Sequence, residues 1–130
     1  MSTNEHRGTI LIVEDDEDIR AAMAELLETE GFEVFVASNG QEGLEVMSQM
    51  KAPCLVLLDL MMPVMNGEDF LRHVRKDPAL DNIPVIIVTA SGRTPLPGTQ
   101  GILKKPFEIS DLFATVATHC PVPAHGSVSP

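Results

Sequence analysis

Carboxylates follow two apolar segments of the sequence, at the point where each segment ends. Asp59 ends the run 54–58, and Glu14 and Asp15 follow the run 10–13. A short apolar run between turn signals predicts a buried strand of a parallel sheet. Carboxylates at the carboxyl ends of such strands lie where open α/β sheets bind ligands. The two acidic groups therefore predict a metal site and not a solvated surface.

The other interpretation of the acidic cluster is the charged first turn of a helix that begins near Asp18. It accounts for residues 16–18, since acidic side chains stabilise helix N-termini. It accounts less well for Glu14 and Asp15, because they come directly from a predicted buried strand. Two like charges ~4 Å apart repel by about 4 kcal/mol at an effective dielectric of 20. A divalent cation relieves this repulsion, and oxygen ligands suit Mg²⁺, with Mn²⁺ as a second candidate.

Two further polar residues lie at the ends of later predicted strands. Lys105 follows the segment 101–104 and precedes Pro106, which restrains the lysine backbone to an extended shape. Thr89 follows the apolar run 85–88. An ordinary surface lysine and a turn hydroxyl are the simplest interpretations. At the same sheet edge, however, Lys105 could pair with Asp59 and a phosphoryl oxygen, and Thr89 could donate a hydrogen bond to that group.

Strand-like and helix-like segments alternate along the chain, and the helix-like segments carry apolar residues at helical spacing. Helices are expected to begin near Asp18, near Asn39 and after Gly67. A last helix carries the apolar residues of 109–116. Strand–helix repeats predict right-handed crossovers and a doubly wound α/β fold whose parallel sheet has five strands. The expected strands are Thr9–Val13, Glu33–Ala37, Cys54–Leu58, Val85–Val88 and Gly101–Lys104.

The alternation breaks between the last two predicted strands. Residues 89–100 contain two prolines and two glycines. Proline removes a backbone donor and glycine weakens a helix, so this composition predicts a loop or one short turn. The fourth helix of the pattern is therefore expected to be short or absent.

The composition excludes several classes of protein. The chain has 130 residues, a formal net charge of −10 and 44% hydrophobic residues, which indicates one acidic domain with a real core. The charge argues against nucleic acid and anionic membranes as partners, and no apolar stretch approaches the ~20 residues that span a bilayer. Cys54 is expected to be an inert core residue and Cys120 an exposed thiol, which favours the reducing cytoplasm.

Four motifs together resemble the receiver domains of bacterial two-component response regulators, in particular stand-alone receivers of the chemotaxis type. The resemblance implies the flavodoxin-like strand order 2-1-3-4-5. It covers residues 9–119, which predicts a receiver domain over that range with flexible segments at 1–8 and 120–130. The motifs are Ile10–Val13 with Glu14-Asp15, Asp59 with Met62-Pro63-Val64-Met65-Asn66-Gly67, Thr89-Ala90, and Lys105-Pro106-Phe107.

The resemblance implies phosphoryl chemistry at Asp59. This carboxylate is expected to accept a phosphoryl group from a sensor histidine kinase or a phosphotransfer protein. Thr89 and Lys105 resemble the hydroxyl and the cation that contact the phosphoryl group, and the Lys105–Pro106 peptide bond is expected to be cis. The chain would then catalyse only its own phosphorylation and dephosphorylation, so it is not expected to be an enzyme in the usual sense. It would signal to a downstream protein by a change of conformation.

The same resemblance implies how the metal is held. Asp15 resembles the direct Mg²⁺ ligand, while Glu14 is expected to act mainly through a metal-bound water. Asp59 and the backbone carbonyl of Met61 complete the expected set. The side chain at position 61 therefore need not matter to the metal.

Two departures from the family pattern concern signalling. Ile102 stands where the family usually has an inward-turning Tyr or Phe, and the missing helix would belong to the usual output face. We therefore expect the segment Ser91–Gln100 and the last helix to carry the readout. Met61 and Ser91 are uncharged at positions that tune phosphoryl hydrolysis, and Met61 is expected to shield the site, which predicts an aspartyl phosphate of moderate or long life.

Three other interpretations stay open at this point. A pseudo-receiver, a binding module that is never phosphorylated, predicts the same fold but no use of Asp59. A magnesium-dependent phosphatase needs a second acid two residues after its nucleophile, and position 61 is Met. A flavodoxin-like carrier needs a phosphate-binding loop after the first strand, where this chain has the acidic segment 14–18.

Overall fold

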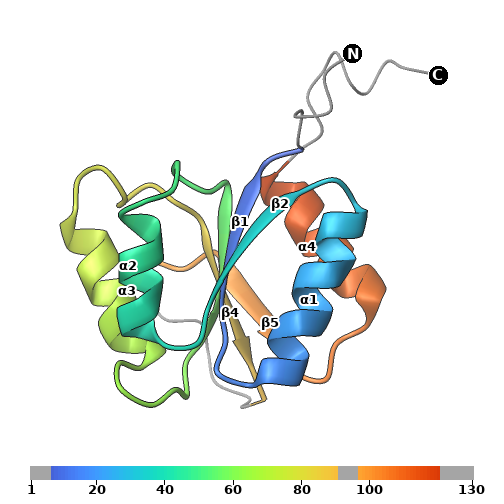
Figure 1. Cartoon of the computed structure of the whole chain (residues 1–130), viewed down its shortest axis with the longest axis horizontal. Helices are drawn as coiled ribbons and strands as arrows, with labels where there is room; N and C mark the ends of the chain where they lie inside the picture. Colours follow the sequence, from blue (N-terminus) through green and yellow to red (C-terminus); the bar gives the residue numbers. More distant parts are fainter. Residues whose placement is uncertain (1–6, 91–96, 121–130) are drawn as a thin grey trace.

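Five parallel strands form the centre of the molecule, between two layers of helices (Figure 1). The computed structural model describes residues 7–90 and 97–120. The strand order is β2-β1-β3-β4-β5, as the resemblance implies. Three expected strand boundaries shift by one residue: β3 begins at Leu55 and not at Cys54, and β3 and β4 each include the polar residue that follows the apolar run. The strands are β1 (Thr9–Val13), β2 (Glu33–Ala37), β3 (Leu55–Asp59), β4 (Val85–Thr89) and β5 (Gly101–Lys104).

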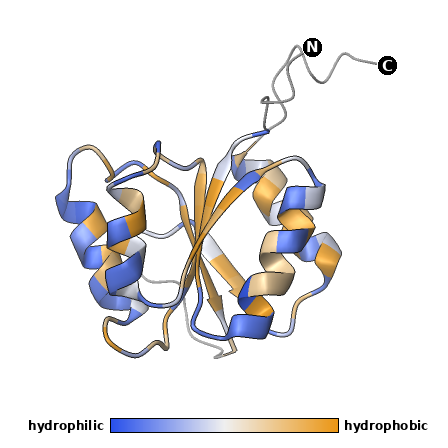
Figure 2. Ribbon diagram, viewed as in Figure 1, coloured by the Kyte–Doolittle hydropathy of each residue, from blue (hydrophilic) through white to orange (hydrophobic). Residues whose placement is uncertain are grey.

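In the described part of the chain, two helices cover each face of the sheet (Figure 1). Helices α1 (Glu17–Thr29) and α4 (Ile109–His119) lie on one face. Helices α2 (Gly40–Met47) and α3 (Gly67–Lys76) lie on the other. The helices turn hydrophilic residues outward, whereas the strands between them are hydrophobic (Figure 2). None of the described helices is long and apolar enough to cross a membrane.

The strands are apolar throughout because each of their faces meets a core. In β1, Ile10 and Ile12 pack among residues on the side of α1 and α4. Leu11 and Val13 pack on the side of α2 and α3. All four side chains are fully buried. This is why a continuous apolar run, and not an alternating one, marks a strand of a parallel sheet with two covered faces.

Polar residues start three of the helices at the carboxyl edge of the sheet. The side chains of Asp16, Asn39 and Asn66 each accept a hydrogen bond from a backbone amide in the first turn. Asn39 was the expected start of its helix, whereas the first helix begins before Asp18, after an N-cap at Asp16. These caps fix where each helix leaves the loops that carry the acidic residues.

The crossover between β4 and β5 contains no helix in its described part, residues 90 and 97–100. The expectation of a short or absent fourth helix is confirmed to this extent. The remaining residues of the predicted loop, 91–96, lie outside the described part of the chain. The segments 1–6 and 121–130, which include most of the predicted flexible ends, also lie outside it, so their flexibility stays a prediction.

The two cysteines form a disulfide, which corrects the expectation from the sequence. Cys54 and Cys120 are bonded, with their Cα atoms 5.6 Å apart. Cys120 is 2% exposed and packs in the core beside α4, so it is not an exposed thiol. The bond joins the residue before β3 to the end of α4. No sequence motif indicates this pairing, since the cysteines are 66 positions apart. The cysteine argument for a reducing compartment no longer holds.

We predict that this disulfide stabilises the fold by closing a long loop in the unfolded chain. Reduction of the wild type should lower the free energy of unfolding by about 2–4 kcal/mol. Urea unfolding with and without a phosphine reductant measures the change. The variant with both Cys54→Ser and Cys120→Ser is the control, because reductant should not shift its midpoint. Equal midpoints for oxidised and reduced wild type would contradict the prediction.

Candidate functional site

Neighbouring strands bring the predicted acidic residues together. In the parallel pairing of β1 with β3, Val13 lies opposite Leu58. Glu14 and Asp59 follow these two residues directly, so both leave the sheet at the same edge. With Asp15 they form a cluster in which one carboxylate oxygen from each residue lies within 4.8 Å of the other two. The sequence predicted this juxtaposition correctly from the strand ends alone.

Glu14 is the most constrained member of the cluster. Its side chain is 2% exposed. Its Oε2 accepts a hydrogen bond of 3.1 Å from the amide of Asp16. The guanidinium of Arg20 donates to the Glu14 carbonyl at 2.9 Å. Neither contact was predicted, because both depend on the tight turn between β1 and α1. Together they fix the Glu14 backbone and one of its two carboxylate oxygens.

Lys105 brings a positive charge to the acidic cluster. Its Nζ lies 2.8 Å from Glu14 Oε1 and 3.9 Å from Asp59 Oδ2. The sequence led us to expect a pair with Asp59, but the closer partner is Glu14. The Lys105 amide donates to the Thr89 carbonyl at 2.8 Å. The Lys105–Pro106 bond is cis, as the resemblance implies.

The second oxygen of Glu14 is not satisfied by this lysine. Glu14 Oε1 is buried and accepts no hydrogen bond of good geometry, although the ammonium lies at ion-pair distance. We interpret the contact as an ion pair whose geometry is poor for a hydrogen bond. A buried carboxylate oxygen without a hydrogen bond is costly. A cation, or a water held by a cation, would satisfy it, so the donor set fits a hard metal ion such as Mg²⁺.

Asp59 lies in an environment that opposes its negative charge. The residue is 5% exposed. Burial, followed by the charge of Glu14, raises the pKa of Asp59 from 3.8 to about 7. The amide of Met61, which donates to Asp59 Oδ1 at 3.2 Å, and the charge of Lys105 lower this pKa, but they are outweighed. With a pKa of about 7, Asp59 is only partly ionised at neutral pH unless a further positive charge lies beside it.

The remaining predicted site residues flank Asp59. Thr89 ends β4, which pairs with β3, and its side chain is 2% exposed. The peptide group of Met61 lies beside the carboxylate, as its amide contact shows. The role of the Met61 carbonyl as a metal ligand stays a prediction. The Met61 side chain is 73% exposed, so it gives Asp59 little cover.

The loop after Asp59 folds tightly against the strand that it leaves. A Cβ at Gly67 would lie 2.5 Å from the Asp59 carbonyl oxygen, which excludes any other residue there without a shift of the backbone. The Gly67 amide donates to the Leu60 carbonyl at 3.0 Å and closes the loop. Val64, at the tip, has φ 69 and is 83% exposed. A β-branched residue in the left-handed region is strained, so the loop stores strain close to the acidic cluster.

The fold and the acidic site define a signalling domain of the two-component class. The family model for the response regulator receiver domain matches residues 10–117. The chain belongs to this family. The stand-alone, chemotaxis-type assignment stays a prediction.

Relatives with known names agree with the family. The chain is 39% identical over 116 residues to the uncharacterized transcriptional regulatory protein YkoG of Bacillus subtilis, covering 85% of this chain and 50% of that protein. It is 38% identical over 114 residues to the transcriptional regulatory protein CpxR of Escherichia coli, covering 82% and 47%. The chain thus spans about half the length of these curated relatives.

Solved structures agree in the same way. The chemotaxis protein CheY4 of Vibrio cholerae is 28% identical with a TM-score of 0.77, covering 85% of this chain and 97% of that one. The receiver domain of a histidine kinase from Syntrophus aciditrophicus is 29% identical with a TM-score of 0.76, covering 87% and 89%. Similar domains therefore occur in several kinds of signalling protein.

We predict that Asp59→Asn stabilises the metal-free protein at neutral and alkaline pH. Because the folded-state pKa of Asp59 is raised, the folded protein holds a proton between pH 3.8 and about 7 that the unfolded chain has lost. Stability from this group is present at low pH and is lost as the pH rises through about 7. The gain from Asn should therefore be near zero at pH 4 and about 1–3 kcal/mol at pH 8.

Denaturant unfolding in EDTA across this pH range measures the difference between wild type and variant. Glu45→Gln, on an exposed position of α2, serves as the matched control and should show no such pH dependence. A gain from Asp59→Asn that is equal at pH 4 and pH 8 would refute the electrostatic explanation.

We also predict that Val64→Gly stabilises the protein. Glycine adopts positive φ without steric cost, and the exposed valine side chain loses little packing. The entropy of glycine in the unfolded chain offsets part of the gain, so the net effect should be about 0.5–1 kcal/mol. Thermal unfolding measures it. Val64→Ala should gain less, because alanine keeps the Cβ; a loss of stability in the glycine variant would show that φ 69 is not strained here.

Proposed function

We propose that this receiver domain accepts a phosphoryl group on Asp59 from a histidine kinase or phosphotransfer protein and signals by a change of conformation. The observation that carries the proposal is the meeting of three carboxylates with one lysine ammonium at the carboxyl edge of the sheet. Their oxygens lie within 4.8 Å of one another, and Lys105 Nζ lies 2.8 Å from the cluster. The family membership supports the same chemistry.

The proposed reaction forms an acyl phosphate. An Asp59 carboxylate oxygen attacks the phosphorus of a phosphohistidine, and the P–N bond breaks. The imidazole nitrogen leaves with the electron pair of that bond and takes up a proton. A held carboxylate is an effective nucleophile when it is in line with the leaving group. Lys105 is already 3.9 Å from Asp59, so its ammonium can turn to an equatorial phosphoryl oxygen.

The acidic cluster would hold Mg²⁺ through Asp15 and Asp59, with Glu14 behind them and the Met61 carbonyl as a further oxygen ligand. When bound, the ion neutralises charge on the phosphoryl oxygens and favours ionised Asp59. Glu14 Oε1 supports this assignment, because it is buried and has an ion-pair contact with Lys105 but no hydrogen bond of good geometry. Thr89 would then turn its hydroxyl toward the new phosphoryl group, which shifts the population toward a second state of the end of β4.

An apolar groove beside the site supports docking of a kinase helix. The groove lies between α1 and the start of α4 and encloses about 500 Å³. It contains Lys105, which also contacts Asp59, so a helix seated there would bring its phosphohistidine to the nucleophile. Its other lining residues are Ile19, Ala22, Met23, Leu26, Ala90, Pro106, Phe107 and Ile109.

The pseudo-receiver is the weaker interpretation, since every residue expected for phosphorylation is present and the acidic members meet in space. A downstream protein target, a cytoplasmic location, and the absence of nucleic-acid or membrane partners stay predictions from the sequence. So does a phosphoryl lifetime of moderate or long duration. The exposure of Met61 leaves the expected shielding by its side chain without support, and Ser91 lies outside the described residues.

We predict that acetyl phosphate with Mg²⁺ adds one phosphoryl group to the wild type. Intact-mass measurement should show a single adduct that Asp59→Ala lacks and that EDTA prevents. Asp15→Asn should reduce the amount of adduct by about tenfold or more, because mutating a metal ligand or a residue that supports one typically lowers metal affinity on that scale.

Asp69→Asn is a matched control, because Asp69 is an acid on α3 that forms an exposed pair with Arg72 and lies outside the cluster. It should be phosphorylated like the wild type. If neither acetyl phosphate nor a panel of histidine kinases gives an adduct on Asp59, the domain is a pseudo-receiver.

A further inference from the structure

Arg20 holds the turn that carries two of the acidic residues. It lies half-buried on α1, and its Nη1 donates to the Glu14 carbonyl at 2.9 Å. That carbonyl belongs to the peptide group that joins Glu14 to Asp15. Because a peptide group is planar, an arginine that fixes its oxygen also fixes the direction in which the chain enters Asp15. Arg20 therefore bears on the backbone of a predicted Mg²⁺ ligand.

The place of Asp15 depends on the residues around it. Asp15 is exposed, whereas Glu14 before it is buried. The Glu14 amide donates to the Ala37 carbonyl at the end of β2 at 3.0 Å, and Asp16 caps α1. The contact of Arg20 completes this frame, since it holds the peptide group that links the buried glutamate to the exposed aspartate.

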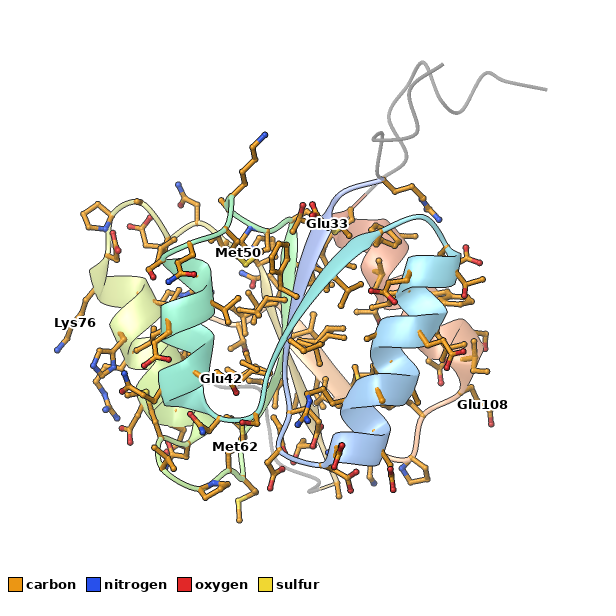
Figure 3. All side chains as sticks on the ribbon, in the orientation of Figure 1. Glu33, Glu42, Met50, Met62, Lys76 and Glu108 are labelled. Atoms are coloured by element: carbon orange, nitrogen blue, oxygen red, sulfur yellow. A yellow bond between two sulfur atoms is a disulfide. The ribbon has the colours of Figure 1, made fainter. Side chains whose placement is uncertain are left out.

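The guanidinium of Arg20 also lies near α2. Glu42, on the first turn of α2, has a lowered pKa, chiefly because its carboxylate accepts hydrogen bonds from Ser38 and in smaller part because of the charge of Arg20. Figure 3 shows Glu42 at the same end of the molecule as Met62, which lies in the loop after Asp59. The arginine thus extends from a helix on one face of the sheet toward a carboxylate on the other face, across the edge that carries the acidic cluster.

We propose that Arg20 is a positioning residue for the divalent cation, which holds the peptide group between Glu14 and Asp15 so that the Asp15 carboxylate faces the cluster before the ion binds. The inference rests on the proposed function, in which Asp15 is a metal ligand. The contact that Arg20 makes at the site is with a backbone carbonyl, so it acts through the chain and not as a ligand. A ligand that is already in place binds more tightly, because less of the chain must be ordered on binding.

Charge and position predict opposite effects when the guanidinium is removed. A cation near a metal site repels the incoming ion, so the loss of its charge alone should strengthen Mg²⁺ binding. The loss of the hydrogen bond to the Glu14 carbonyl frees the backbone of Asp15 and should weaken Mg²⁺ binding. The sign of the change in affinity therefore separates a positioning residue from a nearby charge.

The test is a Mg²⁺ titration of Arg20→Met, which keeps an apolar stem but removes the donor and the charge. Calorimetry without a phosphodonor gives the dissociation constant, which should rise by about tenfold relative to the wild type. At saturating Mg²⁺, acetyl phosphate should still give the adduct on Asp59, because Asp15 is then held by the ion that it binds. Arg20→Lys keeps the charge and a donor, and its dissociation constant should lie within about threefold of the wild-type value.

Arg72→Met is the matched control, since it changes the net charge by the same amount and Arg72 forms an exposed pair with Asp69 on α3. It should bind Mg²⁺ as the wild type does. Urea unfolding in EDTA reports the stability of each variant separately. A merely structural role for Arg20 would lower the unfolding midpoint of Arg20→Met and leave its Mg²⁺ dissociation constant unchanged.

The outcomes separate this inference from the proposed function. If the wild type binds Mg²⁺ and forms the adduct, an unchanged or lower dissociation constant in Arg20→Met overturns the inference alone. A wild type that binds Mg²⁺ but forms no adduct on Asp59 overturns phosphoryl transfer, and the comparison of Arg20 variants still decides the inference. A wild type that binds no Mg²⁺ overturns both.

Discussion

The structure depends on the cost of keeping three carboxylates together at one edge of a buried sheet. Parallel strands end side by side, so the fold itself forces Glu14 and Asp59 into proximity. Glu14 is held by an amide and a lysine, while Asp59 retains a pKa raised to about 7. The cluster is therefore short of positive charge. This shortage of positive charge favours binding of a divalent cation. It also makes the protonation of Asp59 sensitive to any change in the charge around it.

The elements that the sequence predicted well are those specified by local patterns. Apolar runs located all five strands within one residue, since a doubly covered strand must be apolar on both faces. Asn39 was recognised as a helix start because capping needs only the residue and its nearest neighbours. Glu14, Asp15 and Asp59 were brought together correctly because sheet topology converts strand ends into spatial neighbours.

The features that the sequence did not predict depend on distant contacts. Cys54 and Cys120 meet only because α4 packs back across the sheet to the start of β3. Lys105 Nζ lies closer to Glu14 than to Asp59, and no residue spacing in the sequence encodes this difference. Arg75 donates to the backbone carbonyls of Gly98, Asp81 and Ile83; every residue type carries such a carbonyl, so no sequence pattern marks these contacts.

Arg75 shows how the described, irregular part of the β4–β5 connection, residues 97–100, is held against the rest of the protein. A crossover helix satisfies its own carbonyls through internal hydrogen bonds, whereas an irregular segment packed on the protein must find donors elsewhere. Arg75 supplies such donors to Gly98 and to the turn before β4. The position of Gly98 therefore depends in part on α3, the helix that carries Arg75.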